Sequence, residues 1–409
     1  MARVRPTIRF LVASLFVGIV EAAQATEDIE ADFQVGHFAA AQAKARELVQ
    51  SEPENPDAWI YLGLASARLG EQDGAVKAFE KAIAVKPNDA RPYLNLALVY
   101  SQCNDIGGAI SSYQKALALD EYNVSGLYNY GRLLATTGKL REAVDAFEHV
   151  ARLNVWDAGA QTELSKLYLS LNDAPKAETA ARRAVGLAPE SLEANLALAE
   201  VLIASHRHSE AAQLLARCER SNGNSPAFQY TLGVAQMGLH RYQQAIASFQ
   251  KAVRLDPKLD LAHFLMGTAY FARSEMGKAE GSFRRAISLN SKNPLYYSYL
   301  ARVYDAKGPE FRQAAFDSTT KLLALSPGDV EGRLRLAKWA KEAGDLSRAR
   351  TLLEQVVADE PRSAPAHVML ATVYYRLNMR REAQEQQALA EETQNANSSA
   401  RDNASPVLR

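Results

Sequence analysis

The sequence predicts an all-α protein, a solenoid of stacked helical hairpins. A 34-residue period runs without insertion through segments that begin at 56, 90, 124, 158, 192, 226 and 260, and continues at 294, 330 and 364 with one two-residue slip. The seventh position of every segment is large and apolar, and the eighth is small. The twentieth position is always alanine: Ala75, Ala109, Ala143, Ala177, Ala211, Ala245, Ala279, Ala315, Ala349 and Ala383. Periods of this length are typical of supersecondary units that stack into one array.

Each segment predicts two antiparallel helices. Positions 4, 7, 8 and 11 are spaced by three and four residues, so they share one face of a first helix, and positions 20, 24 and 27 share a face of a second. Small residues at positions 8 and 20 allow the two helix axes to approach closely. Large side chains fill the space beside them, among them Trp59, Phe79, Tyr100, Phe147, Phe249 and Phe283.

Proline and glycine mark the ends of these helices. Glycine at position 15 of three segments predicts a turn between the two helices, at Gly70, Gly138 and Gly344. Proline at position 32 stops the second helix because it lacks a backbone donor. It occurs at Pro53, Pro87, Pro189, Pro257, Pro327 and Pro361.

Two irregularities interrupt the pattern. Residues 221–226 read Ser-Asn-Gly-Asn-Ser-Pro, which predicts a shortened second helix within a continuous stack, with a weak domain boundary as the alternative. The two-residue slip falls near residues 307–311 and lengthens a turn between helices. This turn either protrudes from one face of the array or packs back through Phe311.

The segment that begins at Pro56 resembles the tetratricopeptide repeat motif, with Trp59, Leu62, Gly63, Ala75, Phe79, Ala82 and Pro87 in matching places. The resemblance implies a right-handed α-solenoid of about ten to eleven repeats over residues 26–393. An eleventh, partial repeat is indicated by Gly36, Ala41 and Ala45. In this family the first helices line a concave groove that usually binds other proteins, so a protein or peptide segment is the partner that the resemblance implies.

The two ends of the chain differ from the repeats. Residues 1–25 combine three arginines, an apolar run from Phe10 to Val20 and small residues at Ala23 and Ala25. This pattern is typical of a cleaved signal peptide, and the run is short for a retained membrane anchor. We therefore expect a periplasmic or secreted protein, with no integral membrane span after signal removal. Residues 394–409 lack apolar periodicity and predict a disordered C-terminal tail.

Composition and motifs argue against most chemistry. Forty-seven basic residues balance forty-seven acidic ones, so nothing favours nucleic acid as a partner. The sequence holds two cysteines and contains no Gly-x-x-x-x-Gly-Lys-Ser/Thr loop, no Gly-x-Ser-x-Gly elbow, no His-Glu-x-x-His pair and no Cys-x-x-Cys, so we expect neither enzyme activity nor a cofactor. His206 and His240 are one repeat apart, and His208 lies two residues after His206, which leaves a surface metal site as an alternative to ordinary loop histidines.

Functional candidates lie on the expected groove face, positions 2, 5, 9 and 12 of the first helices. In mid-chain this face is apolar, at Leu196, Tyr230, Val234, Met237, Leu261, Phe264 and Phe271, with Leu295 beyond. Towards the C-terminus it is basic, at Arg302, Arg335, Lys338 and Lys341, which suits an acidic flank or a terminal carboxylate. Near the N-terminus Leu98 and Tyr128 occupy the face. Asn95 and Asn129, at position 6, resemble the asparagine ladder of the O-linked N-acetylglucosamine transferase repeats.

An exposed apolar stripe commonly marks a binding surface, whereas tight superhelical winding would bury it between repeats. The sequence favours a non-catalytic interaction scaffold of the bacterial envelope that holds a peptide or helix in its groove. The alternative is an accessory subunit of an envelope enzyme complex, active in polysaccharide synthesis or cytochrome maturation.

Overall fold

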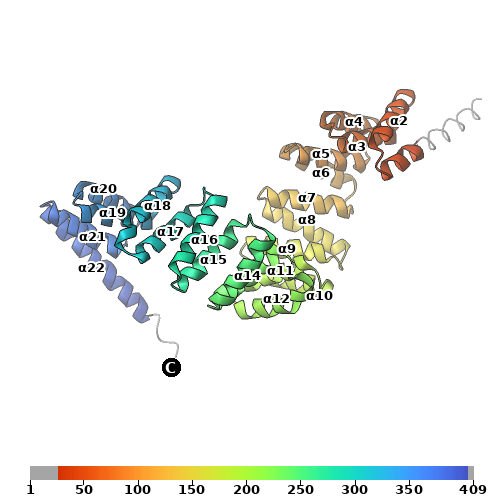
Figure 1. The fold of residues 1–409 in the computed structure, drawn as a ribbon. Helices are drawn as coiled ribbons and strands as arrows, with labels where there is room; N and C mark the ends of the chain where they lie inside the picture. The colour runs from red at the N-terminus through yellow and green to blue at the C-terminus, as the bar shows by residue number, and fades with distance from the viewer. Residues whose placement is uncertain (1–25, 404–409) are drawn as a thin grey trace, which may run out of the picture. The chain divides into compact units, whose positions relative to one another are not determined.

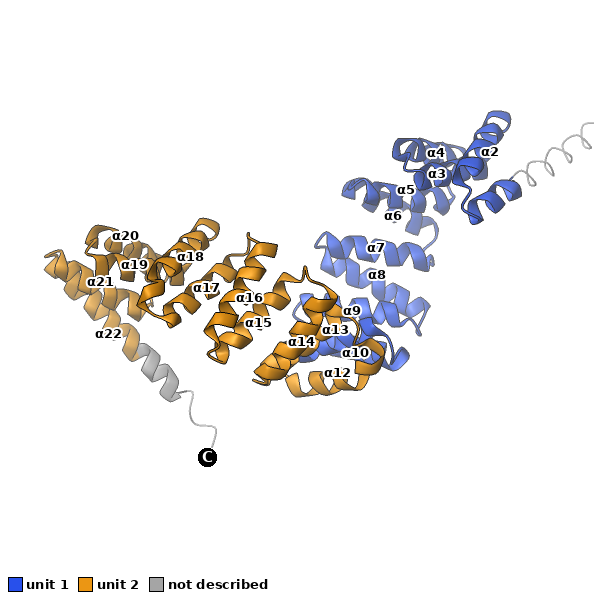
Figure 2. Ribbon diagram, viewed as in Figure 1, with its two compact units in different colours: residues 1–205 blue, residues 206–409 orange. Residues whose placement is uncertain are grey.

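The computed structural model describes residues 26–403, and the regular secondary structure of this range is helical throughout (Figure 1). The predicted signal peptide at residues 1–25 lies outside the described residues. The chain divides between Ser205 and His206 into two compact units, which are described separately below (Figure 2).

Unit 1 begins with helical residues 26–34, which pair with α2 through Ile29, Ala41 and Ala45, all buried, and so form the predicted partial repeat. The helix α2 (Phe38–Ser51) completes this partial repeat. Four hairpins follow, and unit 1 then ends with the first helix of the next repeat. These helices are α3 (Pro56–Arg68), α4 (Gln72–Val85), α5 (Ala90–Gln102), α6 (Ile106–Leu119), α7 (Val124–Thr136), α8 (Leu140–Leu153), α9 (Ala158–Ser170), α10 (Ala174–Leu187) and α11 (Leu192–Ala204).

Unit 2 contains α12 (His208–Asn222), α13 (Pro226–Gly238), α14 (Tyr242–Leu255), α15 (Asp260–Ala272), α16 (Met276–Leu289), α17 (Pro294–Lys307), the 3-10 turn η1 (Pro309–Phe311), α18 (Arg312–Leu325), α19 (Val330–Ala343), α20 (Leu346–Asp359), α21 (Ala364–Arg376) and α22 (Arg380–Asn403). The first helices of both units begin at the predicted segment starts, so the all-α repeat architecture is confirmed.

The core of each hairpin is built around the invariant alanine. Alanine at position 20 is fully buried in every repeat. Where position 8 is glycine, position 24 is a fully buried phenylalanine whose ring fills the space left by the missing side chain. These pairs are Gly63 with Phe79, Gly131 with Phe147, Gly233 with Phe249 and Gly267 with Phe283.

The turns inside the hairpins share one backbone conformation. Position 15 is left-handed in nine of the ten complete repeats, with φ between 57° and 83°. Glycine adopts this region without strain, and Asn and His enter it more readily than most residues. The nine are Gly70, Asn104, Gly138, Asn172, His206, His240, Ser274, Gly344 and Asn378.

The starts of the first helices are capped in the same recurrent way. The residue before the helix is usually Asn, Asp or Ser, and its side chain accepts a backbone N–H of the first turn, as Asn123 does from Gly126 (2.8 Å). Where proline follows at position 32, the residue at position 31 leaves the helical region, as at Lys86, Asp256 and Glu360. These local signals explain why the helices begin and end where they do.

Three expectations about the irregular segments are corrected. Helix α12 has 15 residues where most second helices have 14, so it is not shortened, because no proline follows to stop it. Residues 221–226 end α12 and lead into α13 within unit 2, so the division of the chain is not there. The predicted disorder from residue 394 is wrong as far as Asn403, because α22 continues to that residue. No glycine or proline occurs between Pro365 and Pro406, so nothing in the sequence stops this helix at residue 394.

The two extra residues of the slip are accommodated by the 3-10 turn η1, and Phe311 packs against α17. Its ring stacks on Tyr304 with centroids 6.1 Å apart and planes 8° apart. Lys307 Nζ lies 3.8 Å from the centroid of the same ring. The alternative that the extra residues pack back is therefore the one observed.

Candidate functional site

The apolar stripe of unit 2 consists of Tyr230, Val234, Met237, Leu261, Phe271 and Leu295. Leu261 and Leu295 occupy the same position at the starts of α15 and α17, and each is 46% exposed. The other four are half-buried. Tyr230, Val234 and Met237 lean on the α13–α14 core, and the Tyr230 ring lies 6.1 Å from that of Phe249. Part of the stripe is therefore accessible to a partner and part supports the fold.

Phe264 does not line an open surface. Its side chain is 6% exposed and lies in a buried aromatic cluster. Tyr296 stacks on the ring and Tyr299 meets it edge-on, each with centroids 5.0 Å away. The expectation that Phe264 presents its ring to a ligand is wrong, because two tyrosines of the next repeat cover it.

The N-terminal candidates are only partly brought together. Asn95 and Leu98 line a hollow of about 230 Å³ between α3 and α5, together with Leu64. Asn95 Nδ2 donates to the carbonyl of Arg91 in its own helix (2.9 Å), which uses one amide hydrogen. Asn129, on α7, is not among the residues that line this hollow. Two rungs of an asparagine ladder are therefore not assembled around one hollow.

Tyr128 and Leu196 are half-buried residues of unit 1. The Tyr128 ring meets Phe147 edge-on with centroids 5.1 Å apart, so it packs on the α7–α8 core. Burial, with the nearby carboxylates of Glu163 and Asp157, raises the pKa of the Tyr128 hydroxyl. A peptide-binding role for Tyr128 and Leu196 remains a prediction.

The basic candidates are mostly paired within the protein. The Arg335 side chain is 10% exposed, and its Nε donates to Asp305 Oδ2 and its Nη2 to Glu331 Oε1, both at 2.8 Å. Arg302 lies 3.5 Å from Glu331 and over the Tyr299 ring. The Lys341 carbonyl accepts a bond from Arg376 (2.7 Å). Lys338 is exposed and forms no ion pair with any described residue.

Two adjoining hollows, each about 270 Å³, surround Trp339, and we call them together the Trp339 cleft. Trp339 is at position 10 and so lies outside the groove positions 2, 5, 9 and 12; the nearby two-residue slip is the feature of the sequence that points to this place. Most side chains that line the first hollow are charged, and we call it the polar hollow; the second has a larger apolar share in its lining and is called the apolar hollow. The first is lined by Asp305, Gly308, Pro309, Arg312, Arg335, Lys338, Trp339 and Glu342. The second is lined by Arg312, Gln313, Phe316, Leu336, Trp339, Ala340, Glu342, Ala343, Asp345 and Arg348.

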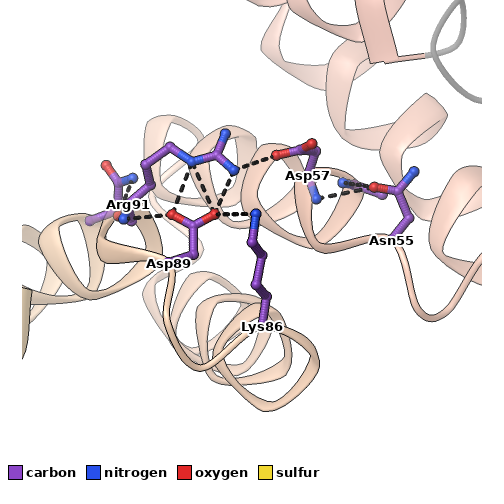
Figure 3. Close-up of polar contacts among 7 residues, drawn as sticks. Asn55, Asp57, Lys86, Asp89 and Arg91 are labelled. Carbon is purple, nitrogen blue, oxygen red and sulfur yellow. Dashed lines mark hydrogen bonds and ion pairs between the residues drawn. The ribbon is translucent and has the colours of Figure 1, made fainter. Parts of the chain in front are cut away.

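A polar cluster in unit 1 is structural (Figure 3). Asp89 caps α5, is 8% exposed, and accepts bonds from the Arg91 backbone and guanidinium. Arg91 also reaches Asp57 of the preceding repeat (2.8 Å), and Lys86 lies 3.9 Å from Asp89. The hydrogen bonds from Arg91 hold the pKa of the Asp89 carboxyl below its usual range. The cluster links the starts of α3 and α5, and its charged side chains pair with one another.

The repeated histidines have a backbone role. His206 and His240 occupy the left-handed turn position, and His240 Nδ1 lies 2.8 Å from the Tyr242 hydroxyl. Among residues 26–403 no three His, Cys, Asp or Glu side chains gather as metal ligands. Turn geometry therefore accounts for the spacing that suggested a metal site.

Comparison with known families agrees with this architecture. Profiles described as tetratricopeptide repeat match residues 29–92, 90–123, 124–154, 230–294 and 340–401. The chain belongs to the tetratricopeptide repeat family. A profile described as anaphase-promoting complex, cyclosome, subunit 3 matches residues 170–252 of this tetratricopeptide repeat protein.

Several solved structures are similar to this tetratricopeptide repeat protein. A tetratricopeptide repeat protein from Parabacteroides merdae is 17% identical, with a TM-score of 0.52, and the match covers 61% of this chain and 98% of that one. YrrB, described as a TPR protein with an unusual peptide-binding site, is 27% identical, with a TM-score of 0.39 and coverage of 46% and 97%. Yeast Tom70 is 17% identical, with a TM-score of 0.41 and coverage of 95% and 98%. No curated protein matches the sequence.

Family membership places the protein among repeat scaffolds that bind other proteins and are generally non-catalytic. None of the helices within residues 26–403 has the length and hydrophobicity needed to cross a membrane.

This tetratricopeptide repeat protein also exposes two aromatic residues outside the groove positions predicted from the sequence. Tyr122 (66% exposed) and Trp156 (77%) occupy equivalent sites in the loops after α6 and α8.

Proposed function

We propose that the protein is a non-catalytic scaffold that holds an extended or helical segment of a partner protein against the apolar stripe of unit 2. The observation that carries the proposal is the pair Leu261 and Leu295, each 46% exposed at equivalent positions of two helices that contact one another. Exposed apolar side chains in a row commonly mark an interaction surface. Half-buried Met237 and Tyr230 extend this surface with one adaptable and one rigid side chain.

Site-specific photocrosslinking in the producing cells tests this surface. A photoreactive phenylalanine analogue at Leu261 or Leu295 is expected to capture a specific partner protein. The matched control is the same analogue at Arg254, an exposed residue of the second helix α14. The additional variant Leu261→Lys is expected to reduce co-purification of the captured partner. Equal capture from Arg254 and from the two leucines would contradict binding at the stripe.

We further propose that the protein acts in the bacterial envelope after export. The support is the sequence of residues 1–25, with its arginines, short apolar run and terminal small residues. Mass spectrometry of the protein from fractionated cells tests this step. The expected result is a mature N-terminus near Thr26 in the periplasmic or secreted fraction. A cytoplasmic protein that begins at Met1 or Ala2 would contradict it.

A further inference from the structure

The Trp339 cleft exists because of the two-residue slip. Gly308 has φ 121°, and a Cβ there would lie 2.8 Å from Glu310 Oε2, so glycine suits this backbone. Phe311 folds onto Tyr304 and Lys307, which holds η1 against the end of α17. Gly308 and Pro309 consequently form a wall of the polar hollow.

The acidic side chains of the cleft already have partners within the protein. Asp305 accepts from Arg335, and Glu342 pairs with Arg312 at 2.9 Å. Asp345 caps α20 by accepting the Arg348 backbone N–H at 3.0 Å. Each of these three carboxylates is therefore already paired, two with arginine side chains and one with a backbone N–H. The charge that a ligand meets in the cleft is set by the remaining basic groups.

Two basic groups of the polar hollow keep unused donors. Arg335 is nine-tenths buried, and its Nη1 is a buried nitrogen that donates to no described group. Lys338 is exposed beside it, without an ion pair to any described residue. An unpaired buried guanidinium N–H is unfavourable, and a carboxylate is the acceptor that suits a guanidinium and an ammonium together. The polar hollow is complementary to one carboxylate.

The second hollow offers apolar walls. Phe316 and Trp339 lie with ring centroids 5.9 Å apart, and Leu336, Ala340 and Ala343 add to the apolar part of the lining, which also contains polar and charged side chains. Each hollow, at about 270 Å³, is somewhat smaller than the roughly 300–1,000 Å³ of common ligand pockets. Their size suits individual side chains of a larger partner.

We propose that the Trp339 cleft binds a short segment of a partner protein in which a carboxylate lies next to a large apolar side chain. Lys338 and Arg335 receive the carboxylate, and the hollow beside Trp339 receives the apolar group. None of these residues belongs to the apolar stripe of α13, α15 and α17, so this inference goes beyond the proposed function and stands without it.

Selection from a random hexapeptide library displayed on phage tests the proposal with the full chain. Selection is expected to enrich Asp or Glu within two residues of Phe, Leu or Trp. Synthetic copies of an enriched peptide, amidated at the C-terminus, are then measured by fluorescence anisotropy. Replacing the acidic residue by its amide, or the apolar residue by Ala, is expected to weaken binding at least tenfold, since a charge-assisted bond or a buried side chain is lost. Binding of peptides that have a free C-terminus and no acidic side chain would show that a terminal carboxylate can replace the acidic side chain in the polar hollow.

Protein variants locate the site. Lys338→Gln removes an exposed cation and is expected to weaken binding at least tenfold, whereas Lys341→Gln, on the same helix but outside the cleft, leaves it unchanged. Ala343→Phe fills the apolar hollow from an exposed position and is expected to abolish binding while circular dichroism stays native. Leu261→Lys leaves the peptide bound. Failure to enrich acidic–apolar peptides, or equal binding by the Lys338, Ala343 and Lys341 variants, would overturn the proposal.

Discussion

The pairing of Gly267 with Phe283 predicts that one added methyl group destabilises the α15–α16 hairpin. A Cβ at position 267 would lie 2.7 Å from Phe283 Cε1, roughly 1 Å inside the usual carbon–carbon contact of about 3.5–4.0 Å. The ring has little room to move, because it is fully buried and its centroid lies 5.6 Å from that of Phe264 and 5.7 Å from that of Tyr299. Gly267→Ala is therefore an overpacking substitution.

The expected magnitude follows from two opposing effects. Overpacking a well-filled core raises the free energy of the folded state by about 1–3 kcal/mol. Alanine in a helix interior is favoured over glycine by about 1 kcal/mol. Gly281→Ala is the matched control, because it lies inside α16 of the same hairpin with nothing within 4 Å of the added Cβ. The control is expected to gain up to about 1 kcal/mol and Gly267→Ala to lose about 1 kcal/mol, a difference of about 2 kcal/mol.

Hydrogen exchange of the full chain, followed by mass spectrometry of peptides from residues 260–289, measures the opening free energy of this hairpin. Peptides from α3 and α4 serve as the internal reference. The double variant Gly267→Ala with Phe283→Leu is expected to recover part of the loss, since the chain itself combines Ala337 with Leu353 at these two positions, both buried. Equal stability of the Gly267→Ala and Gly281→Ala variants would mean that the Phe283 ring moves aside at no cost, which would refute the reasoning. So would a double variant that is no more stable than Gly267→Ala alone.

Three further predictions concern other parts of the molecule. Gly70→Ala is expected to lower stability by about 1 kcal/mol and Gly70→Asn by less, because φ is +80° there and the equivalent turn uses Asn104; urea unfolding checks the order. Asp89→Asn keeps the cap acceptor but removes the charge, so it is expected to lose about 1.5–3 kcal/mol near pH 7. Because the folded pKa of Asp89 is lowered, this contribution is present above about pH 4 and lost as the pH falls through the folded value, so unfolding curves of the two proteins are expected to converge in acid. Trp156→Phe is expected to remove most iodide-accessible tryptophan emission, and unchanged quenching would contradict the exposure of that ring.

The repeat architecture was predictable because its signals are local and recur. Alanine at position 20 is buried in every repeat, and proline at position 32 follows the second helix wherever it occurs, so the segment starts match the helix starts. The left-handed turn was predictable only where it is glycine. Asn104, His206 and Ser274 adopt the same left-handed conformation, but their residue types do not predict it. Local propensity therefore located the turns without fixing their conformation.

The site was less predictable because its exposure depends on neighbouring repeats. Phe264 occupies a groove position by spacing, but Tyr296 and Tyr299 from the next repeat cover it. The Trp339 cleft depends on how the slip folds, and the return of Phe311 onto Tyr304 was one of two alternatives. Arg335 was expected on a basic surface, whereas Asp305 and Glu331 pair with two of its nitrogens.

The constant spacing of the left-handed turns bears on how such a gene changes in length. Most repeats end in an extended residue directly before the next first helix, as at Asp89, Asn123 and Asp329. Duplication or loss of one whole hairpin therefore joins two backbone segments of the same conformation. An insertion of two residues does not restore this match between backbone segments. In this chain the two extra residues are accommodated in the turn at Gly308 and Pro309. Length differences among homologous proteins are expected to come as whole hairpins, with smaller changes confined to the turns.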